Sequence, residues 1–386
     1  MTSFTYSFFQ ITLTTIFFIS SSSSSSFAST TNSRPFKRIY AFGDSFTDTG
    51  NTRSVTGPSG FGHVSSSPYG MTFFHHPTNR YSDGRLVIDF VTQELYLPFL
   101  QPYILLKDKT NASSSSGVNF AVAGSTAINH AFFVKNNLTL DVTPQSIQTQ
   151  LIWFNKFLES QGCKGGVTTT PGCKASVDDA LFWVGEIGVN DYAYIVGSEV
   201  SGDTIRKLAI STKTQFLQEL LKKGAKYVVV QGLPPSGCLP LAMSLADEND
   251  RDAMGCVKSV NNQCYTHNVA FQAKLQQLRI QFPQAVIVYA DYWNAYATVF
   301  NNPARYGLKE RFKACCGSGT PPYNYEVFAV CGSPSAKACP NPSQYINWDG
   351  VHLTEAMYKV VADMFLHGKF SHPPFSYLLD RKQRQG

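Results

Sequence analysis

Asp349 and His352 stand three residues apart in the segment NWDGVHLTEA, with Gly350 between them. On a turn, this spacing lets the carboxylate reach one imidazole nitrogen and leaves the other free to take a proton from a hydroxyl. The pair therefore predicts proton transfer to and from a nucleophile elsewhere in the chain. A metal site would need a third ligand, and the other obvious candidates, His75 and His76, lie in an aromatic-rich loop typical of surface or packing. We expect neither a metal nor a cofactor.

Ser45 is the candidate for the hydroxyl. It lies in AFGDSFTDTGN, after an apolar run, and Gly43 permits backbone conformations that are closed to residues with a side chain. The chain can therefore turn sharply and present Ser45 at the start of a following helix, where amide groups and the dipole favour negative charge. Capping that helix is the commoner role of such a serine. No Gly-x-Ser-x-Gly segment occurs, so the usual nucleophile elbow is absent and other residues must support a catalytic serine.

Two further segments offer hydrogen-bond donors. Gly124, in NFAVAGSTA, would present a backbone N–H with no side chain in the way, and Asn190, in GEIGVNDY, would bring an amide group. Donors of both kinds stabilise the oxyanion that forms when a nucleophile attacks a carbonyl group. Either segment alone also fits an ordinary turn. The segment GLPPSGCLP at residues 232–240 is rigid and contains a cysteine, so we interpret it as structural.

Apolar runs and helical periodicity indicate the elements that must position these residues. Runs rich in Val, Ile and aromatic residues predict buried strands at residues 38–42, 118–122, 180–184, 227–230 and 285–289. Helical periodicity is clear at residues 147–158 after a Thr143-Pro144 cap, at 257–278 before Pro283, and at 357–365 before Gly368. The alternation predicts a single α/β domain, with a parallel sheet of about five strands and helices on both faces. Ligands bind beyond the carboxyl ends of such strands, where the candidate residues are expected.

Composition and charge exclude several classes of protein. The net charge of +6 over 386 residues is mild, and a basic cluster occurs only in the tail, at residues 380–384. A nucleic-acid-binding protein concentrates Lys and Arg along one face, so we expect no nucleic-acid partner. The hydrophobic content of 43% is that of an ordinary globular domain.

The first 28 residues have the pattern of a secretory signal peptide. An apolar stretch over residues 8–19 is followed by a serine tract and by small residues around Ala28. The stretch is shorter and more polar than the run of about 20 apolar residues that a membrane-spanning helix needs. We expect a signal peptide at residues 1–28, a secreted domain at residues 29–386, and no stable membrane insertion. Because the leader starts without Lys or Arg, a membrane-anchoring or organelle leader is the alternative.

Nine cysteines agree with an oxidising compartment. They lie in clusters such as Cys163 with Cys173, and their spacings suit disulfides that staple loops, whereas zinc sites use CxxC pairs, which the chain lacks. The odd count predicts one unpaired thiol. Two sequons, at Asn111 and Asn137, would be usable for N-glycosylation in a secreted protein.

The blocks named above resemble those of a known family. GDSFTDTGN at residues 43–51, GVND at 188–191 and DGVH at 349–352 resemble three signature blocks of the GDSL, or SGNH, family of lipases and esterases. RYSDGRLVIDF at residues 80–90, NFAVAGSTA and LPPSGCLP resemble accompanying blocks of its plant branch. The blocks follow the family's order from about Arg38 to Gly368. The resemblance implies a single SGNH-hydrolase domain of the flavodoxin-like type.

The resemblance also implies roles for individual residues. Ser45 would be the nucleophile, His352 the general base and acid, and Asp349 the residue that orients the imidazole. The expected function is a secreted serine esterase that hydrolyses carboxylic esters through an acyl-enzyme, on small or specialised-metabolite esters. The alternatives are an acyltransferase that uses an alcohol or sugar acceptor, a lipase for longer-chain lipids, and a binding protein that keeps the fold without catalysis.

The implied oxyanion hole consists of the Ser45 N–H, the Gly124 N–H and the side-chain amide of Asn190. The glycine block departs from the plant pattern, because Val122 replaces a small polar residue and Ser125 follows the glycine. The resemblance therefore gives the least support to the assignment of Gly124 as an oxyanion donor.

Overall fold

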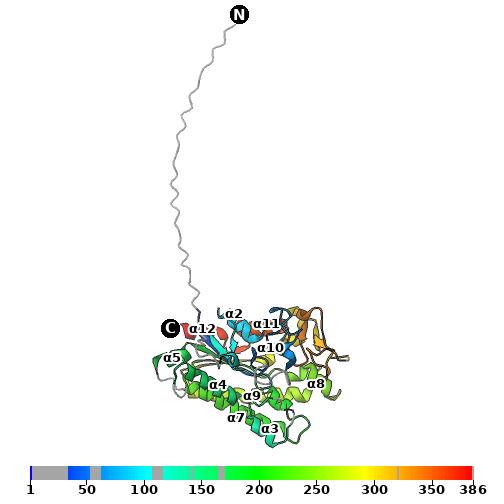
Figure 1. Ribbon diagram of the computed structural model, residues 1–386, viewed down its shortest axis with the longest axis horizontal. Coiled ribbons are helices and arrows are strands. Elements are labelled where there is room, and N and C mark those ends of the chain that lie inside the picture. The colour runs from blue at the N-terminus through cyan, green and yellow to red at the C-terminus, as the bar shows by residue number, and fades with distance from the viewer. Residues whose placement is uncertain are drawn as a thin grey trace. The chain divides into compact units, whose positions relative to one another are not determined.

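The computed structural model describes residues 1, 34–52, 62–106, 116–138, 140, 143–163, 170–319 and 321–384. Residues 34–386 form one compact unit, which contains every element described below (Figure 1). The leader predicted at residues 1–28, apart from Met1, and the sequon at Asn111 lie outside the described residues.

A seven-stranded sheet forms the centre of this unit, in the order β11-β6-β5-β4-β1-β3-β2. Neighbouring strands are parallel, except that β11 is antiparallel to β6. The strands are β1 (Arg38–Phe42), β2 (Gln101–Pro102), β3 (Gly117–Asn119), β4 (Ala180–Val184), β5 (Tyr227–Gln231), β6 (Val286–Ala290) and β11 (Ser371–His372).

The predicted fold class is confirmed by this strand order. The five predicted strands are β1 and β3 to β6, and their order is that of flavodoxin-like folds. The two additional strands, β2 and β11, lie at the edges and have two residues each, too short to form a recognisable apolar run. The order of the strands reverses at β1, so the exits of β1 and β4 flank the crevice where such folds bind ligands.

The second predicted strand is shorter than expected. β3 ends at Asn119, whose Nδ2 donates to the Thr47 carbonyl at 2.7 Å and whose Oδ1 accepts from the Ala121 N–H at 2.9 Å. These side-chain bonds replace regular ladder bonds. The chain still follows β1, since the Val122 N–H donates to the Gly43 carbonyl at 3.2 Å.

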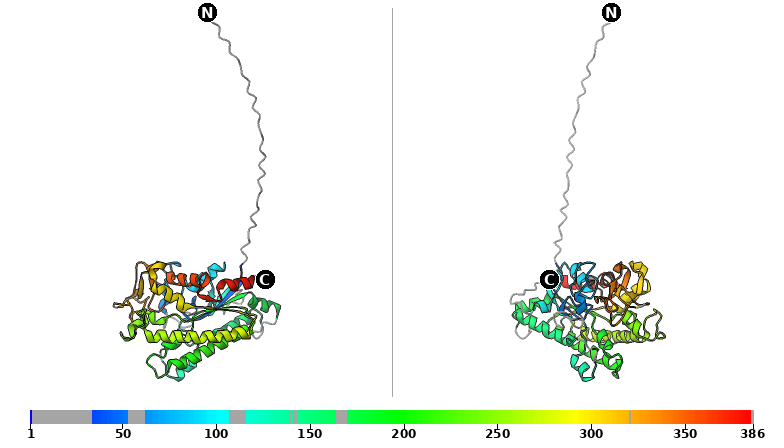
Figure 2. Two further views of the ribbon diagram at one scale, coloured as in Figure 1. Left: turned by 180° about the vertical axis from the view of Figure 1, so that it is seen from behind. Right: turned by 45° about the vertical axis from the view of Figure 1, so that its right-hand side comes forward.

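Helices cover both faces of the sheet (Figures 1 and 2). On one face, α2, α10, α11 and α12 pack against strand residues such as Ile39 and Trp183; on the other, α4, α7 and α9 pack against their neighbours, such as Tyr40 and Phe182. Every residue of β4 and β5 is buried, as continuous apolar runs predict.

The α-helices are α2 (Val87–Glu94), α3 (His130–Lys135), α4 (Ile147–Ser160), α5 (Pro171–Asp178), α6 (Val189–Ala193), α7 (Gly202–Lys222), α8 (Pro240–Leu245), α9 (Lys258–Gln281), α10 (Tyr292–Asn301), α11 (Glu355–Leu366) and α12 (Phe375–Gln383). Among helices in the described ranges, none has the length and apolar character needed to cross a membrane.

The predicted cap of α4 was wrong. The helix begins at Ile147, after Ser146, and not at Thr143-Pro144. Ser146 forms a parallel bridge with Thr126, and the Ile147 N–H donates to the Thr126 carbonyl at 2.9 Å. This pairing keeps the preceding residues extended, so the helix cannot start earlier.

Two small sheets and four disulfides organise the remaining segments. β7 (Glu310–Ala314) pairs with β10 (Tyr345–Asn347), and β8 (Cys316–Gly317) pairs with β9 (Lys337–Ala338). The disulfides are Cys163–Cys173, Cys238–Cys256, Cys315–Cys339 and Cys316–Cys331. Cys264 is the unpaired thiol and is buried. The segment at residues 232–240 thus carries one end of a disulfide.

Candidate active site

Ser45, His352 and Asp349 form a continuous chain of hydrogen bonds. The Nε2 atom of His352 lies 2.7 Å from Ser45 Oγ, and its Nδ1 atom lies 2.8 Å from Asp349 Oδ2. The first contact joins residues 307 positions apart in the sequence. All three side chains are buried, with 6–7% of their surface exposed. The structure therefore brings together the hydroxyl, the imidazole and the carboxylate that the sequence separates.

A tight turn after β10 sets the spacing of Asp349 and His352. The His352 N–H donates to Asp349 Oδ1 at 2.8 Å, and the Trp348 N–H donates to the His352 carbonyl at 2.7 Å. Gly350 has φ +98°, and a Cβ there would lie 2.1 Å from the ring of Tyr325. Glycine is therefore required both by the backbone conformation and by the close packing. As predicted, α11 follows at once, capped by Thr354.

The Asp349 carboxylate is held in its ionised form. Burial alone would raise its pKa, but the facing His352 imidazole, the His352 N–H and the Tyr69 hydroxyl lower the pKa to about 2. Tyr69 donates to Asp349 Oδ2 at 2.7 Å. The rings of Tyr81 and Phe46 lie 4.6 and 5.5 Å from the imidazole ring and limit its rotation. Tyr69 was not predicted, because no local pattern connects it to a residue 280 positions away.

Ser45 lies in a turn and not at the start of a helix. Residues 45–47 form this turn after β1, and the first helical residue is Asn51. Gly43 has φ +142°, and a Cβ there would lie 3.1 Å from the Glu186 carbonyl, so the predicted need for glycine agrees with the structure. The prediction of a helix failed because the side chain of Asp48 replaces the helical bonds. Asp48 accepts from the N–H groups of Gly50 and Asn51, each at 2.7 Å.

Two buried side chains that were not predicted hold this turn. The Gln150 side chain accepts from the Gly43 N–H at 3.0 Å and donates to the Gly43 carbonyl at 2.7 Å and to Ser125 Oγ at 3.0 Å. Asp48 Oδ2 accepts from the Ala123 N–H at 2.9 Å. Both therefore tie the β1 exit to the β3 exit. The polar run after Ser45 is the sequence pattern that could have indicated Asp48. Gln150 lies in an amphipathic helix, where no pattern sets it apart from its neighbours.

The candidate oxyanion donors gather beside the serine. Asn190, in the first turn of α6, donates from Nδ2 to the Ser125 carbonyl at 3.0 Å and to Asp44 Oδ2 at 3.2 Å. Gly124 has φ +76°, and its carbonyl accepts from the Tyr194 hydroxyl at 2.7 Å. Within the described part of the chain, the N–H groups of Ser45 and Gly124 have no protein acceptor. They are thus available to a ligand, whereas the Asn190 amide already has two acceptors.

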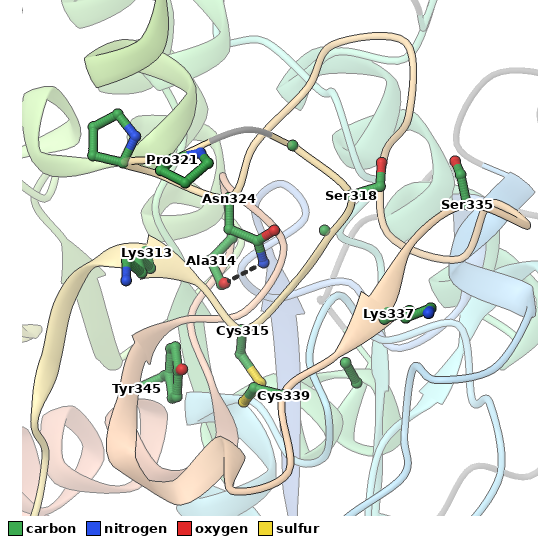
Figure 3. Close-up of a pocket in the computed structure, with 14 residues that line it drawn as sticks. Lys313, Ala314, Cys315, Ser318, Pro321, Asn324, Ser335, Lys337, Cys339 and Tyr345 are labelled. Atoms are coloured by element: carbon green, nitrogen blue, oxygen red, sulfur yellow. Dashed lines mark hydrogen bonds between the residues drawn. A yellow bond between two sulfur atoms is a disulfide. The ribbon is translucent and has the colours of Figure 1, made fainter.

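The other candidate positions lie apart from this site. His75 and His76 are exposed, and the described residues contain no group of three or more His, Cys, Asp or Glu that could hold a metal ion. Asn137 is exposed at the end of α3. A cavity of about 490 Å³ lies near β7, β8 and β9 with the Cys315–Cys339 disulfide in its wall, and none of the triad or donor residues lines it (Figure 3).

Comparison with known proteins agrees with this geometry. Residues 39–365 match the family described as GDSL-like Lipase/Acylhydrolase. A GDSL esterase/lipase of Arabidopsis thaliana is 65% identical over 353 residues, which cover 90% of each chain. Acetylajmalan esterase 2 of Rauvolfia serpentina is 38% identical over 339 residues, which cover 86% of this chain and 90% of that protein. The protein therefore belongs to the GDSL lipase/acylhydrolase family and is a carboxylic ester hydrolase.

Proposed function

We propose that the protein is a secreted serine esterase that works through an acyl-enzyme. Ser45 Oγ attacks the ester carbonyl while His352 Nε2 removes its proton, and the same nitrogen then protonates the departing alcohol. Water, activated by His352, releases the acyl group and regenerates the serine. The observation that carries the proposal is the 2.7 Å contact between Ser45 Oγ and His352 Nε2.

Asp349 would fix the tautomer of the base. An ionised carboxylate bonded to Nδ1 requires the proton on that nitrogen, which leaves Nε2 as the acceptor for the serine proton. With its pKa lowered to about 2, Asp349 stays ionised at neutral pH and stabilises the imidazolium that forms during attack.

The oxyanion would be bound by the N–H groups of Ser45 and Gly124 and by the Asn190 amide. The first two have no competing acceptor in the described residues. The contact from Asn190 to Asp44 is long, at 3.2 Å, so the same N–H can be shared with a charged oxyanion while Asp44 keeps the amide in place.

The substrates would be small esters, such as acetyl esters of specialised metabolites. The support comes from the similarity to acetylajmalan esterase 2, from the burial of Ser45, and from the rings of Phe46 and Tyr81, which pack against the His352 imidazole. Four disulfides and an exposed sequon asparagine at position 137 support secretion, and the small residues around Ala28 support cleavage after about residue 28. N-terminal sequencing of protein from the medium of expressing plant cells tests the secretion proposal, and protein retained inside the cells would contradict it.

The catalytic proposal is tested with a panel of acetyl to long-chain esters. Wild-type protein should hydrolyse short-chain esters, and Ser45→Ala should lower kcat by at least about 10⁴-fold, as loss of a nucleophile does elsewhere. Ser371→Ala is the matched control, because Ser371 is also buried but donates to the Phe365 carbonyl at the far edge of the sheet. Equal activity in wild type and Ser45→Ala would refute the assignment.

A further inference from the structure

A pair of buried acids lies directly behind the Ser45 turn and has no part in the mechanism above. Asp44 and Glu186 follow β1 and β4 and are 1% and 0% exposed. The Asp44 N–H donates to the Glu186 carbonyl at 3.2 Å, and the two carboxyl groups lie within hydrogen-bonding reach of each other. The pair therefore joins the two strand exits that flank the crevice.

The Asp44 side chain links the serine turn to Asn190. Its Oδ1 accepts from the Phe46 N–H at 3.0 Å, and its Oδ2 accepts from Asn190 Nδ2 at 3.2 Å. The other Asn190 hydrogen goes to the Ser125 carbonyl at 3.0 Å. The amide is thus held between the β1 and β3 exits, close to the free N–H groups of Ser45 and Gly124.

A proton on Asp44 leaves the pair of acids with a single negative charge, on Glu186. Two ionised carboxylates this close would repel each other and the developing oxyanion. Glu186 Oε2 is buried and has no hydrogen-bond donor in the described residues, and a protonated Asp44 supplies one. Burial and the neighbouring Glu186 raise the pKa of Asp44 well above its ordinary value.

The remaining negative charge on Glu186 has a buried counterion. Lys213, on α7, is fully buried, and its Nζ donates to the Gln231 carbonyl at 3.1 Å. Gln231 Oε1 in turn accepts from the Glu186 N–H at 2.8 Å. Although burial lowers the pKa of Lys213 to about 8, Glu186 and its neighbours hold it charged at neutral pH. Asp191, the third acid of this cluster, accepts from two backbone N–H groups, each at 2.8 Å, and burial raises its pKa to about 7.

We propose that Asp44 is a positioning residue for ester hydrolysis: as a neutral acid bonded to Glu186, it orients the Asn190 amide and places no second negative charge beside the oxyanion. This inference rests on the serine-esterase function proposed above, which Ser45→Ala tests separately. Asparagine is nearly isosteric with a neutral aspartic acid. Its amide nitrogen can donate to Glu186 while its oxygen accepts from Asn190, and only the bond from the Phe46 N–H to Oδ1 is lost.

The test compares Asp44→Ala with Asp44→Asn in the full-length protein, using 4-nitrophenyl acetate as the substrate. Asp44→Ala should lower kcat by about tenfold or more with KM changed by less than about twofold, since removing an oxyanion donor outright costs about 100- to 1,000-fold. Asp44→Asn should recover most of this loss. Similar losses of kcat in both variants would overturn the neutral-acid role of Asp44. An unchanged kcat in Asp44→Ala would overturn its role as a positioning residue.

A double-mutant cycle tests whether Asp44 acts through Asn190. In an Asn190→Ala background, adding Asp44→Ala should lower kcat by less than about twofold, and an undiminished loss contradicts the proposal. Asp291→Asn is the matched control: Asp291 is a buried carboxyl at the β6 exit that caps α10, and its replacement should leave kcat unchanged. If Asp44→Ala does not fold, Asp44→Asn alone tests the proposal. A kcat about tenfold or more below that of the wild type in this variant overturns it.

Discussion

Replacing Tyr69 by phenylalanine should separate the ionisation of Asp349 from the packing around it. The hydroxyl donates to Asp349 Oδ2 at 2.7 Å, and the ring packs edge-on against Tyr81 and Trp348. Phenylalanine keeps the ring contacts and removes only the hydroxyl. The substitution Tyr69→Phe therefore perturbs a single charge-assisted hydrogen bond.

The expected effect follows from the pKa of Asp349. A buried hydrogen bond to a charged group contributes about 1.5–3 kcal/mol, and one pKa unit corresponds to about 1.4 kcal/mol. Losing the bond should therefore raise the pKa of Asp349 from about 2 back toward its ordinary 3.8. A depressed carboxyl pKa stabilises the folded state above the unfolded pKa, and this stability is lost as the pH falls through the folded pKa. The variant should be about 2 kcal/mol less stable at pH 7, and the difference should shrink between about pH 4 and pH 2.

The assay is urea unfolding followed by tryptophan fluorescence, with the disulfides intact, at several pH values. Tyr296→Phe is the control, because the Tyr296 hydroxyl is buried and has no hydrogen-bond partner in the described residues. Its removal should change stability little at any pH. A loss in Tyr69→Phe that is independent of pH, or no larger than that of the control, would refute the reasoning. Since Asp349 remains ionised at pH 7 in the variant, kcat should fall by no more than about tenfold.

Three further substitutions test the supports of the site. Asn190→Ala should lower kcat for a short-chain ester by about 100- to 1,000-fold with little change in KM, because one oxyanion donor is lost. Gln150→Leu leaves the Gly43 N–H buried without its acceptor, while the Gly43 carbonyl keeps the Val122 N–H as a donor, and should lower the free energy of unfolding by about 1–3 kcal/mol in urea titrations. Gly350→Ala places a Cβ 2.1 Å from an aromatic ring at φ +98° and should abolish most turnover, whereas Gly307→Ala, at φ +76° with open space, should cost stability only.

Local constraint explains why the triad could be predicted from the sequence. The Asp349–His352 turn closes on itself, so its spacing alone predicts the contact between carboxylate and imidazole. The strands could be predicted because their runs are buried on both faces and carry no alternation. Their order places the exits of β1, β3 and β4 at adjacent positions of one edge, which gathers Ser45 with the donor segments.

Side chains that act at a distance could not be predicted in this way. Gln150 bonds to Gly43 across 107 residues and Tyr69 to Asp349 across 280, and neither has a local pattern that marks the contact. The same applies to Lys213, a buried helical lysine whose Nζ donates to the carbonyl of Gln231 in a later strand. The helix predicted after Ser45 failed for a related reason, since the carboxylate of Asp48 supplies bonds that a propensity-based argument assigns to the backbone.

Buried polar side chains that act at a distance also hold the turns of the site in place. Each strand exit that carries a candidate residue is bonded to another exit by a buried polar side chain: Gln150 joins β1 to β3, and Asp44 joins β1 to β4 through Asn190. Such hydrogen bonds are strong in a buried environment, and a buried polar group left without its partner is strongly destabilising. Preorganised donors need no rearrangement when the oxyanion forms. Gln150, which no motif marks, and Asp44, which lies inside one, therefore keep the candidate residues in place.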